Sequence, residues 1–139
     1  MLSIFRRGGL PLQQIVFKGK IVTGNGEGRT FVNLWWVKKQ IKERLHFTAY
    51  PGTLNLLLNH ESDKIKKFLK KSQFIRISPV EGFCEGIAYP AHINSIKCAI
   101  IIPEIENYPK NLIEIVAPIN LRDSLNAKDG DELSVSFFV

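Results

Sequence analysis

The sequence predicts a mainly β fold with a few short helices. Most apolar residues fall in short runs that end at proline, glycine or asparagine, which is typical of strands joined by tight turns. Helical periodicity is confined to brief segments. The chain has 139 residues, 45% of them hydrophobic, which is enough for one hydrophobic core. We expect an N-terminal tail over residues 1–14, which contain Gly8, Gly9 and Pro11 without a clear period, and one domain over residues 15–139.

The first half of the domain mixes strands with one amphipathic helix. A strand is expected over Ile15–Val22, ending at a cluster of glycines, and extended structure returns over Thr30–Val32. Apolar residues then recur at helical spacing from Leu34 to Leu45, with charged residues between them, which predicts an amphipathic helix. After a turn, Thr53–Leu58 is expected to form the next strand.

A lysine-rich helix follows that strand. Ser62 or Asp63 can cap it, and its apolar residues predict one buried side. The net charge of the chain is +6, which favours polyanionic partners such as nucleic acid or a phosphorylated ligand. A charge run of this kind is more often a solvated helix face. The lysines of this helix are Lys64, Lys66, Lys67, Lys70 and Lys71.

Strands dominate the rest of the chain, each bounded by proline, glycine or asparagine. A brief helix and a tight turn precede the final strand. The expected strands are Phe74–Ile77, Phe83–Ile93, Ser95–Ile102, Leu112–Val116 and Leu133–Val139, the helix is Leu121–Leu125, and the turn is Lys128-Asp129-Gly130-Asp131.

The composition restricts the class of protein. No apolar run approaches the ~18 residues of a membrane span, and the residues around Arg6 and Arg7 do not resemble a secretory signal. We therefore expect a cytoplasmic protein without a membrane partner. The two cysteines, Cys84 and Cys98, have no histidine at ligand spacing, which argues against structural zinc, while a disulfide stays open.

A glycine-rich segment directly after the first strand is a candidate phosphate-binding loop. Alternate glycines let backbone amides converge on phosphate oxygens, and an arginine adds a permanently charged donor fork. The segment fits neither the P-loop nor the dinucleotide-binding pattern. A glycine-rich hairpin with a solvent-facing arginine explains it equally well from local sequence. The segment consists of Gly24, Asn25, Gly26, Glu27, Gly28 and Arg29.

Two further positions carry possible chemistry. Thr53 and Asn55 project to the same face of a strand, so their oxygens could address one magnesium ion, with nucleotide phosphates supplying negative charge. Taken alone, both are more often ordinary strand and turn residues. Glu114 interrupts a strongly apolar strand, which makes it a candidate general base if it is buried. The alternative is that Glu114 lies on the solvated face of an edge strand.

Together these segments resemble the archaeal riboflavin kinases that use CTP, over roughly Val16–Val135. The resemblance rests on three motifs in the same order and spacing, followed by the turn at Lys128. Each motif is weak alone, and their joint occurrence is specific. The motifs are G-x-G-E-G-R followed by the aromatic Phe31, G-T-L-N-L at Gly52–Leu56, and E-I-x-A-P-x-x-L-R at Glu114–Arg122.

The resemblance implies a six-stranded cradle-loop β-barrel, akin to AbrB-like regulators. It also implies transfer of phosphate from CTP to the terminal ribityl hydroxyl of riboflavin, giving FMN and CDP. By this resemblance, Thr53 and Asn55 hold magnesium, and Glu114 contacts the flavin and orients or deprotonates the attacking hydroxyl. The residues implied to bind CTP are Gly24, Asn25, Gly26, Glu27, Gly28, Arg29, Ile119, Asn120, Leu121 and Arg122.

One departure from the family concerns the flavin. Family members commonly carry a threonine in the loop before the glutamate strand, whereas this chain has Glu106 or Asn107 at that place. The flavin pocket is expected to differ there, because the charge of Glu106 would sit poorly near a flavin phosphate. Tyr108 could stack on the flavin ring, and a surface position explains it equally well.

Two other functions remain open. A basic AbrB-like barrel could bind DNA without catalysis, although such a module needs neither the oxygens of Thr53 and Asn55 nor Glu114. A flavin- or nucleotide-binding protein without turnover is the other alternative. The kinase is the favoured function, as a monomer with riboflavin and CTP as its partners and nucleic acid as the less favoured one.

Overall fold

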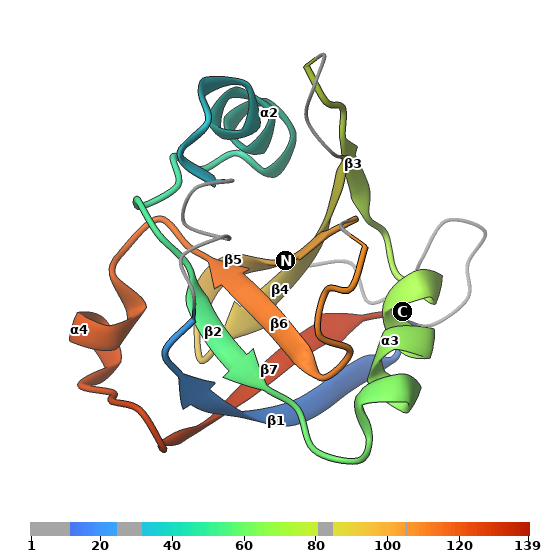
Figure 1. Ribbon diagram of the computed structural model, residues 1–139, viewed down its shortest axis with the longest axis vertical. Coiled ribbons are helices and arrows are strands. Elements are labelled where there is room, and N and C mark those ends of the chain that lie inside the picture. Colours follow the sequence, from blue (N-terminus) through green and yellow to red (C-terminus); the bar gives the residue numbers. More distant parts are fainter. Residues whose placement is uncertain (1–11, 25–31, 81–84, 105) are drawn as a thin grey trace.

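The computed structural model describes residues 12–24, 32–80, 85–104 and 106–139. Antiparallel strands dominate this part of the chain, and helices lie around their outside (Figure 1). The strands are β1 (Gln14–Val22), β2 (Leu54–Leu57), β3 (Ile75–Ile77), β4 (Gly86–Ile93), β5 (Ile96–Pro103), β6 (Leu112–Val116) and β7 (Glu132–Phe138), and the helices are α2 (Trp35–Leu45), α3 (Ser62–Lys71) and α4 (Leu121–Leu125).

The strands close into a barrel. They are paired in the order β3-β4-β5-β6-β2-β1-β7, and β4 pairs in addition with β7 at His92 and Ser136. This last pairing joins the two ends of the sheet, so that β4, β5, β6, β2, β1 and β7 form a six-stranded antiparallel barrel. Along one edge of β4, β3 pairs with the first residues of the strand and β7 pairs near its end, at His92. The mainly β class and the six-stranded barrel are thereby confirmed.

The barrel is packed on both of its faces. Successive side chains of a strand point to opposite faces, and on β6 Ile113 and Ile115 belong to the core inside the barrel. Val116 belongs to a second core outside the barrel, where α2 covers the sheet with residues such as Val37 and Ile41. Glu114 lies between Ile113 and Ile115, so it faces the same side as Val116. The alternation therefore directs Glu114 out of the barrel interior and toward this covered outer face.

Most of the elements predicted from the sequence are confirmed to within one or two residues, and β6 and α4 have the predicted bounds. Two local predictions are wrong. Val32 is helical rather than extended, and it lies just before α2, with its side chain packed in the same core as that helix. Glu61 is the N-cap of α3 in place of Ser62 or Asp63, and its amide donates to the side-chain oxygen of Asn59 at 2.9 Å. The domain boundary near residue 15 stays a prediction.

Some expectations fall outside the described residues. These include the tail as far as residue 11, Thr30 in the extended segment, and Cys84, which leaves the disulfide prediction untested. Cys98 is a free, buried cysteine. In the part of the chain that the structure describes, no helix has the length and apolar character needed to cross a membrane.

Candidate functional site

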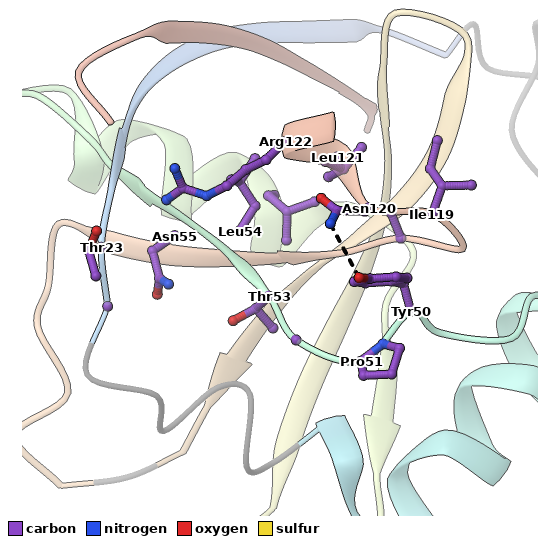
Figure 2. Close-up of a pocket in the computed structure, with 14 residues that line it drawn as sticks. Thr23, Tyr50, Pro51, Thr53, Leu54, Asn55, Ile119, Asn120, Leu121 and Arg122 are labelled. Atoms are coloured by element: carbon purple, nitrogen blue, oxygen red, sulfur yellow. Dashed lines mark hydrogen bonds between the residues drawn. The ribbon is translucent and has the colours of Figure 1, made fainter. Parts of the chain in front are cut away.

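An open cavity of about 410 Å³ lies at one end of the barrel, where β1 and β6 end and β2 begins (Figure 2). Its walls come from residues 23–24, from residues 50–55 and from several residues between 115 and 122. These segments are far apart in the sequence and meet because β2 pairs with both β1 and β6. The topology thus gathers parts of all three sequence motifs around one space.

The lining contains every described residue that the sequence singled out for nucleotide and metal. Asn25, Gly26, Glu27, Gly28 and Arg29 lie outside the described residues, so only the first residue of the glycine segment can be placed. The predicted residues that line the cavity are Gly24, Thr53, Asn55, Ile119, Asn120, Leu121 and Arg122.

Gly24 lies directly against the side chain of Asn55. A Cβ atom at position 24 would be 2.5 Å from Nδ2 and 2.6 Å from Oδ1 of Asn55, distances that real Cβ atoms essentially never show. A larger residue at position 24 would fit only if the side-chain amide of Asn55 moved away from its present position. The first glycine of the predicted loop and the predicted metal ligand thus form one packed unit.

Glu114 is buried, with 2% of its surface exposed, and both of its carboxylate oxygens are hydrogen-bonded. Thr53 Oγ1 donates to Oε1 at 2.8 Å, and the Tyr108 hydroxyl donates to Oε2 at 2.6 Å. In the pairing of β2 with β6, Glu114 lies directly opposite Asn55. The edge-strand interpretation of Glu114 is wrong, because β6 has β2 on one side and β5 on the other.

Glu114 does not itself line the cavity and lies behind Thr53. Tyr108 is half-buried, and its hydrogen bond to Glu114 accounts for its position better than a purely surface role. Glu106 and Asn107 are exposed, on the same loop as Tyr108, and neither lines the cavity. Asn107 has φ of 64°, a left-handed conformation that asparagine tolerates.

The donors in the cavity suit a magnesium ion that also binds phosphate. In the described ranges, no cluster of three or more His, Cys, Asp or Glu residues could hold a metal. Thr53 and Asn55 instead offer two neutral oxygen donors at the cavity wall. Because Thr53 gives its hydroxyl hydrogen to Glu114, its oxygen lone pairs remain available to a cation. Magnesium commonly keeps few protein ligands and takes substrate phosphates as the others, so these residues fit it.

Asn120 joins two walls of the cavity. Its side-chain nitrogen donates to the Tyr50 hydroxyl at 3.2 Å, the contact dashed in Figure 2. Its side-chain oxygen accepts from the amide of Asp123 at 3.2 Å and so caps α4. Sequence reasoning placed Asn120 in the site and assigned Tyr50 only to a turn, because the tyrosine lies 70 positions away in the sequence.

Arg122 and Thr23 share a carboxylate partner. Arg122 extends from α4 toward the side of the cavity where Thr23 lies (Figure 2). Its Nη2 donates to Asp129 Oδ1 at 2.7 Å, while the Thr23 hydroxyl donates to Asp129 Oδ2. The Thr23 hydroxyl and the Arg122 guanidinium hold the pKa of Asp129 below its ordinary value. Thr23 carried no sequence signal beyond a strand end, and Asp129 was noted only as part of the turn that follows the three motifs.

Comparison with known proteins identifies the family. The family model for CTP-dependent riboflavin kinases, which carries the description "Domain of unknown function DUF120", matches residues 21–137. The chain belongs to this family. The match spans β2, β6, α4 and the turn before β7, and so includes every described cavity residue.

Individual members of this riboflavin kinase family are similar over nearly the whole chain. The riboflavin kinase of Methanosarcina barkeri is 42% identical over an alignment of 131 positions, which covers 89% of this chain and 57% of that protein. The riboflavin kinase of Ignicoccus hospitalis is 36% identical, covering 96% of this chain and 80% of the relative. The riboflavin kinase of Saccharolobus solfataricus is 35% identical, and the match covers 99% of this chain and 82% of that protein. The chain therefore spans between about half and four fifths of the relatives named here.

Proposed function

We propose that the chain transfers the terminal phosphate of CTP to riboflavin, giving FMN and CDP. Membership of the CTP-dependent riboflavin kinase family supports this proposal. The observation that carries it is the convergence of Gly24, Asn55 and Arg122 on one cavity, with Glu114 bonded to the cavity residue Thr53. A DNA-binding barrel without catalysis would have no use for a buried carboxylate at this place. We also propose a cytoplasmic monomer.

CTP would occupy the cavity at the end of the barrel. A volume of about 410 Å³ is in the range of small-molecule sites, and polar residues such as Thr53, Asn55 and Arg122 line it. Gly24 leads into the glycine segment, which by resemblance cradles the phosphates together with the residues up to Arg29. Ile119, Asn120, Leu121 and Arg122 would contact the nucleotide from the opposite wall.

Thr53 and Asn55 would hold magnesium at the phosphates of the nucleotide. When bound, the ion supplies positive charge to the phosphate oxygens, which phosphoryl transfer requires. The buried Glu114 would strengthen Thr53 as a ligand, because it accepts the hydrogen of the Thr53 hydroxyl. Removal of divalent ions should therefore abolish turnover and leave the fold intact.

Glu114 would act on the acceptor. The terminal ribityl oxygen forms a bond to the γ-phosphorus, the bond from that phosphorus to the β,γ-bridging oxygen breaks, and CDP leaves. The ribityl proton would pass to Glu114, or Glu114 would only orient the hydroxyl. Thr53 and Tyr108 each donate a hydrogen bond to one carboxylate oxygen of Glu114 and so fix its rotamer. Alignment of the reacting groups is the main requirement of phosphoryl transfer. Glu106 and Asn107 would lie toward the flavin.

The decisive experiment incubates purified protein with riboflavin, magnesium and either CTP or ATP. FMN is separated by chromatography and detected by its fluorescence. We expect FMN with CTP, much less with ATP, and none when EDTA replaces magnesium. A folded protein that forms no FMN with CTP would contradict the proposal, and tight binding of riboflavin without FMN would favour a binding protein instead.

A further inference from the structure

Asp129 lies outside the cavity wall, yet both of its carboxylate oxygens bind residues of that wall. Arg122 donates to one oxygen at 2.7 Å and Thr23 donates to the other. Arg122 also donates to the carbonyl oxygen of Val22 at 3.5 Å. The Asp129 carboxylate thus holds together two cavity segments, at Thr23 and at Arg122, that are about a hundred positions apart in the sequence.

The turn that carries Asp129 is itself fixed to the end of β1. The amide of Gly130 donates to the carbonyl of Ile21 at 2.8 Å, and the amide of Ile21 donates to the carbonyl of Asp131 at 2.8 Å. Within the turn, the amide of Lys128 donates to the side chain of Asp131 at 2.9 Å. These contacts do not involve the Asp129 side chain, so the carboxylate has a defined position from which to hold its partners.

We propose that Asp129 is a positioning residue for the nucleotide, which keeps Thr23 at the glycine segment and Arg122 at the start of α4 in register across the cavity. The inference rests on the proposed function, since it assigns the nucleotide to this cavity. Asp129 would not touch the nucleotide. It would act through the two residues that it binds.

Asp129 also compensates part of the positive charge that Arg122 could offer to a phosphate. Its guanidinium is paired with a carboxylate and a backbone carbonyl, so its positive charge is already compensated. Removing the charge of Asp129 has two opposite effects on a triphosphate. A freed Arg122 would attract the phosphates more strongly, while a loosened wall would bind every part of the nucleotide less well. The positioning role requires the second effect to dominate.

The test compares Asp129→Asn and Thr23→Val with the unaltered chain. Titration calorimetry with magnesium and CTP measures affinity, and initial rates with CTP and UTP measure selectivity. We expect CTP to bind about five- to tenfold more weakly, in line with the net effect of one partly exposed hydrogen bond. The preference for CTP over UTP should fall by a similar factor, and the KM for riboflavin should stay unchanged.

Asp131→Asn is the matched control, because Asp131 is a carboxylate of the same turn that binds only the Lys128 amide among the described contacts. It should leave affinity and selectivity for CTP unchanged. Equal or tighter CTP binding by Asp129→Asn with unaltered selectivity would overturn the proposal. So would an equal loss in the Asp131 variant, because the turn as a whole would then be responsible.

Hydrogen exchange measures the anchor without any substrate. The amide of Ile21 is bonded to Asp131, and the amide of Ala127 is bonded to Arg122 at 2.9 Å. The Ala127 amide should exchange faster in Asp129→Asn, because Arg122 loses its carboxylate partner. The Ile21 amide should be unchanged, because its bond to the turn does not involve the Asp129 side chain. Unchanged exchange at Ala127 would overturn the anchoring role. A wild-type chain that neither binds CTP nor forms FMN would instead remove the proposed function, while exchange still decides whether Asp129 holds the two segments.

Discussion

Gly24 and Asn55 show how one residue constrains another at the site. The backbone at Gly24 passes so close to the Asn55 amide that a methyl group would collide with it. The constraint concerns space alone, because no positive φ is involved at Gly24.

Gly24→Ala should therefore displace Asn55 and weaken the binding of magnesium with CTP by about tenfold or more, since Asn55 is the proposed ligand. Calorimetric titration of CTP with magnesium measures the change. Gly19→Ala provides the contrast, because its Cβ would meet Leu56 at 2.9 Å in the barrel core. That variant should lower the melting temperature, with CTP affinity retained. Equal CTP affinity in Gly24→Ala would contradict the importance of this contact.

Glu114 provides the second residue-level prediction. Glu114→Gln keeps an acceptor for Thr53 and places an amide where the Tyr108 hydroxyl now donates. We expect kcat to fall by about a hundredfold, the size typical of a lost general base, with a much smaller change in riboflavin affinity. Rapid-quench rates and flavin fluorescence titration separate the two effects. Weaker riboflavin binding with an unchanged kcat would leave Glu114 as a flavin contact only. Tyr108→Phe is the control that keeps the carboxylate.

At the scale of elements, the turn before β7 connects the cavity to the strand that completes the barrel. Asp129 has a lowered pKa because its charged form accepts from Thr23 and Arg122. A carboxylate with a lowered pKa stabilises the folded state above its unfolded pKa of about 3.9. This contribution is lost as the pH falls through the lower folded value.

The melting temperatures of the wild type and of Asp129→Asn should accordingly differ at pH 7 and converge as the pH falls below about 4. Differential scanning fluorimetry between pH 7 and pH 2 measures this. Because Arg122 and Asp129 are about half-exposed, the difference should be small and should shrink in high salt. A difference that grows toward low pH would show that the pKa of Asp129 is raised in the folded chain.

Sequence patterns predicted the elements well and the contacts between them incompletely. The bounds of β6 were predictable because an apolar run stops at Ala117-Pro118. The bounds of α4 were also predicted, while the cap that Asn120 gives this helix appeared only in the structure. The sequence placed the N-cap of α3 at Ser62 or Asp63, whereas the helix begins after Glu61, whose amide donates to the side-chain oxygen of Asn59. The partners of Glu114 could not be predicted, since they depend on the strand register that brings Thr53 and Tyr108 to it. Asp129 looked like an ordinary turn residue for the same reason.

For the whole molecule, closure of the barrel determines which groups solvent can reach. Cys98 is 1% exposed inside the barrel, on the strand β5 that pairs with β4 and β6. Burial raises the pKa of the Cys98 thiol to about 12. The thiolate is the reactive form, so Cys98 should be inert while the barrel is closed.

In a Cys84→Ser background, which leaves one thiol, Cys98 should not react with a disulfide reagent at pH 8 in the native state. It should react fully in denaturant. The reaction rate at intermediate denaturant should follow global unfolding measured by circular dichroism, because Cys98 is exposed only when the barrel opens. Fast labelling without denaturant would indicate that β5 opens separately. The Cys98→Ala variant in the same background gives the blank.

The hydrogen bond between Thr53 and Glu114 has a consequence for how the two substrates meet. It joins the proposed metal ligand to the proposed acceptor contact through a single 2.8 Å link. Thermodynamic reciprocity requires that whatever riboflavin does to the affinity for magnesium and CTP, the nucleotide does equally to the affinity for riboflavin. We expect each substrate to raise the affinity of the protein for the other. In Thr53→Val the dissociation constant of each substrate should no longer depend on the other.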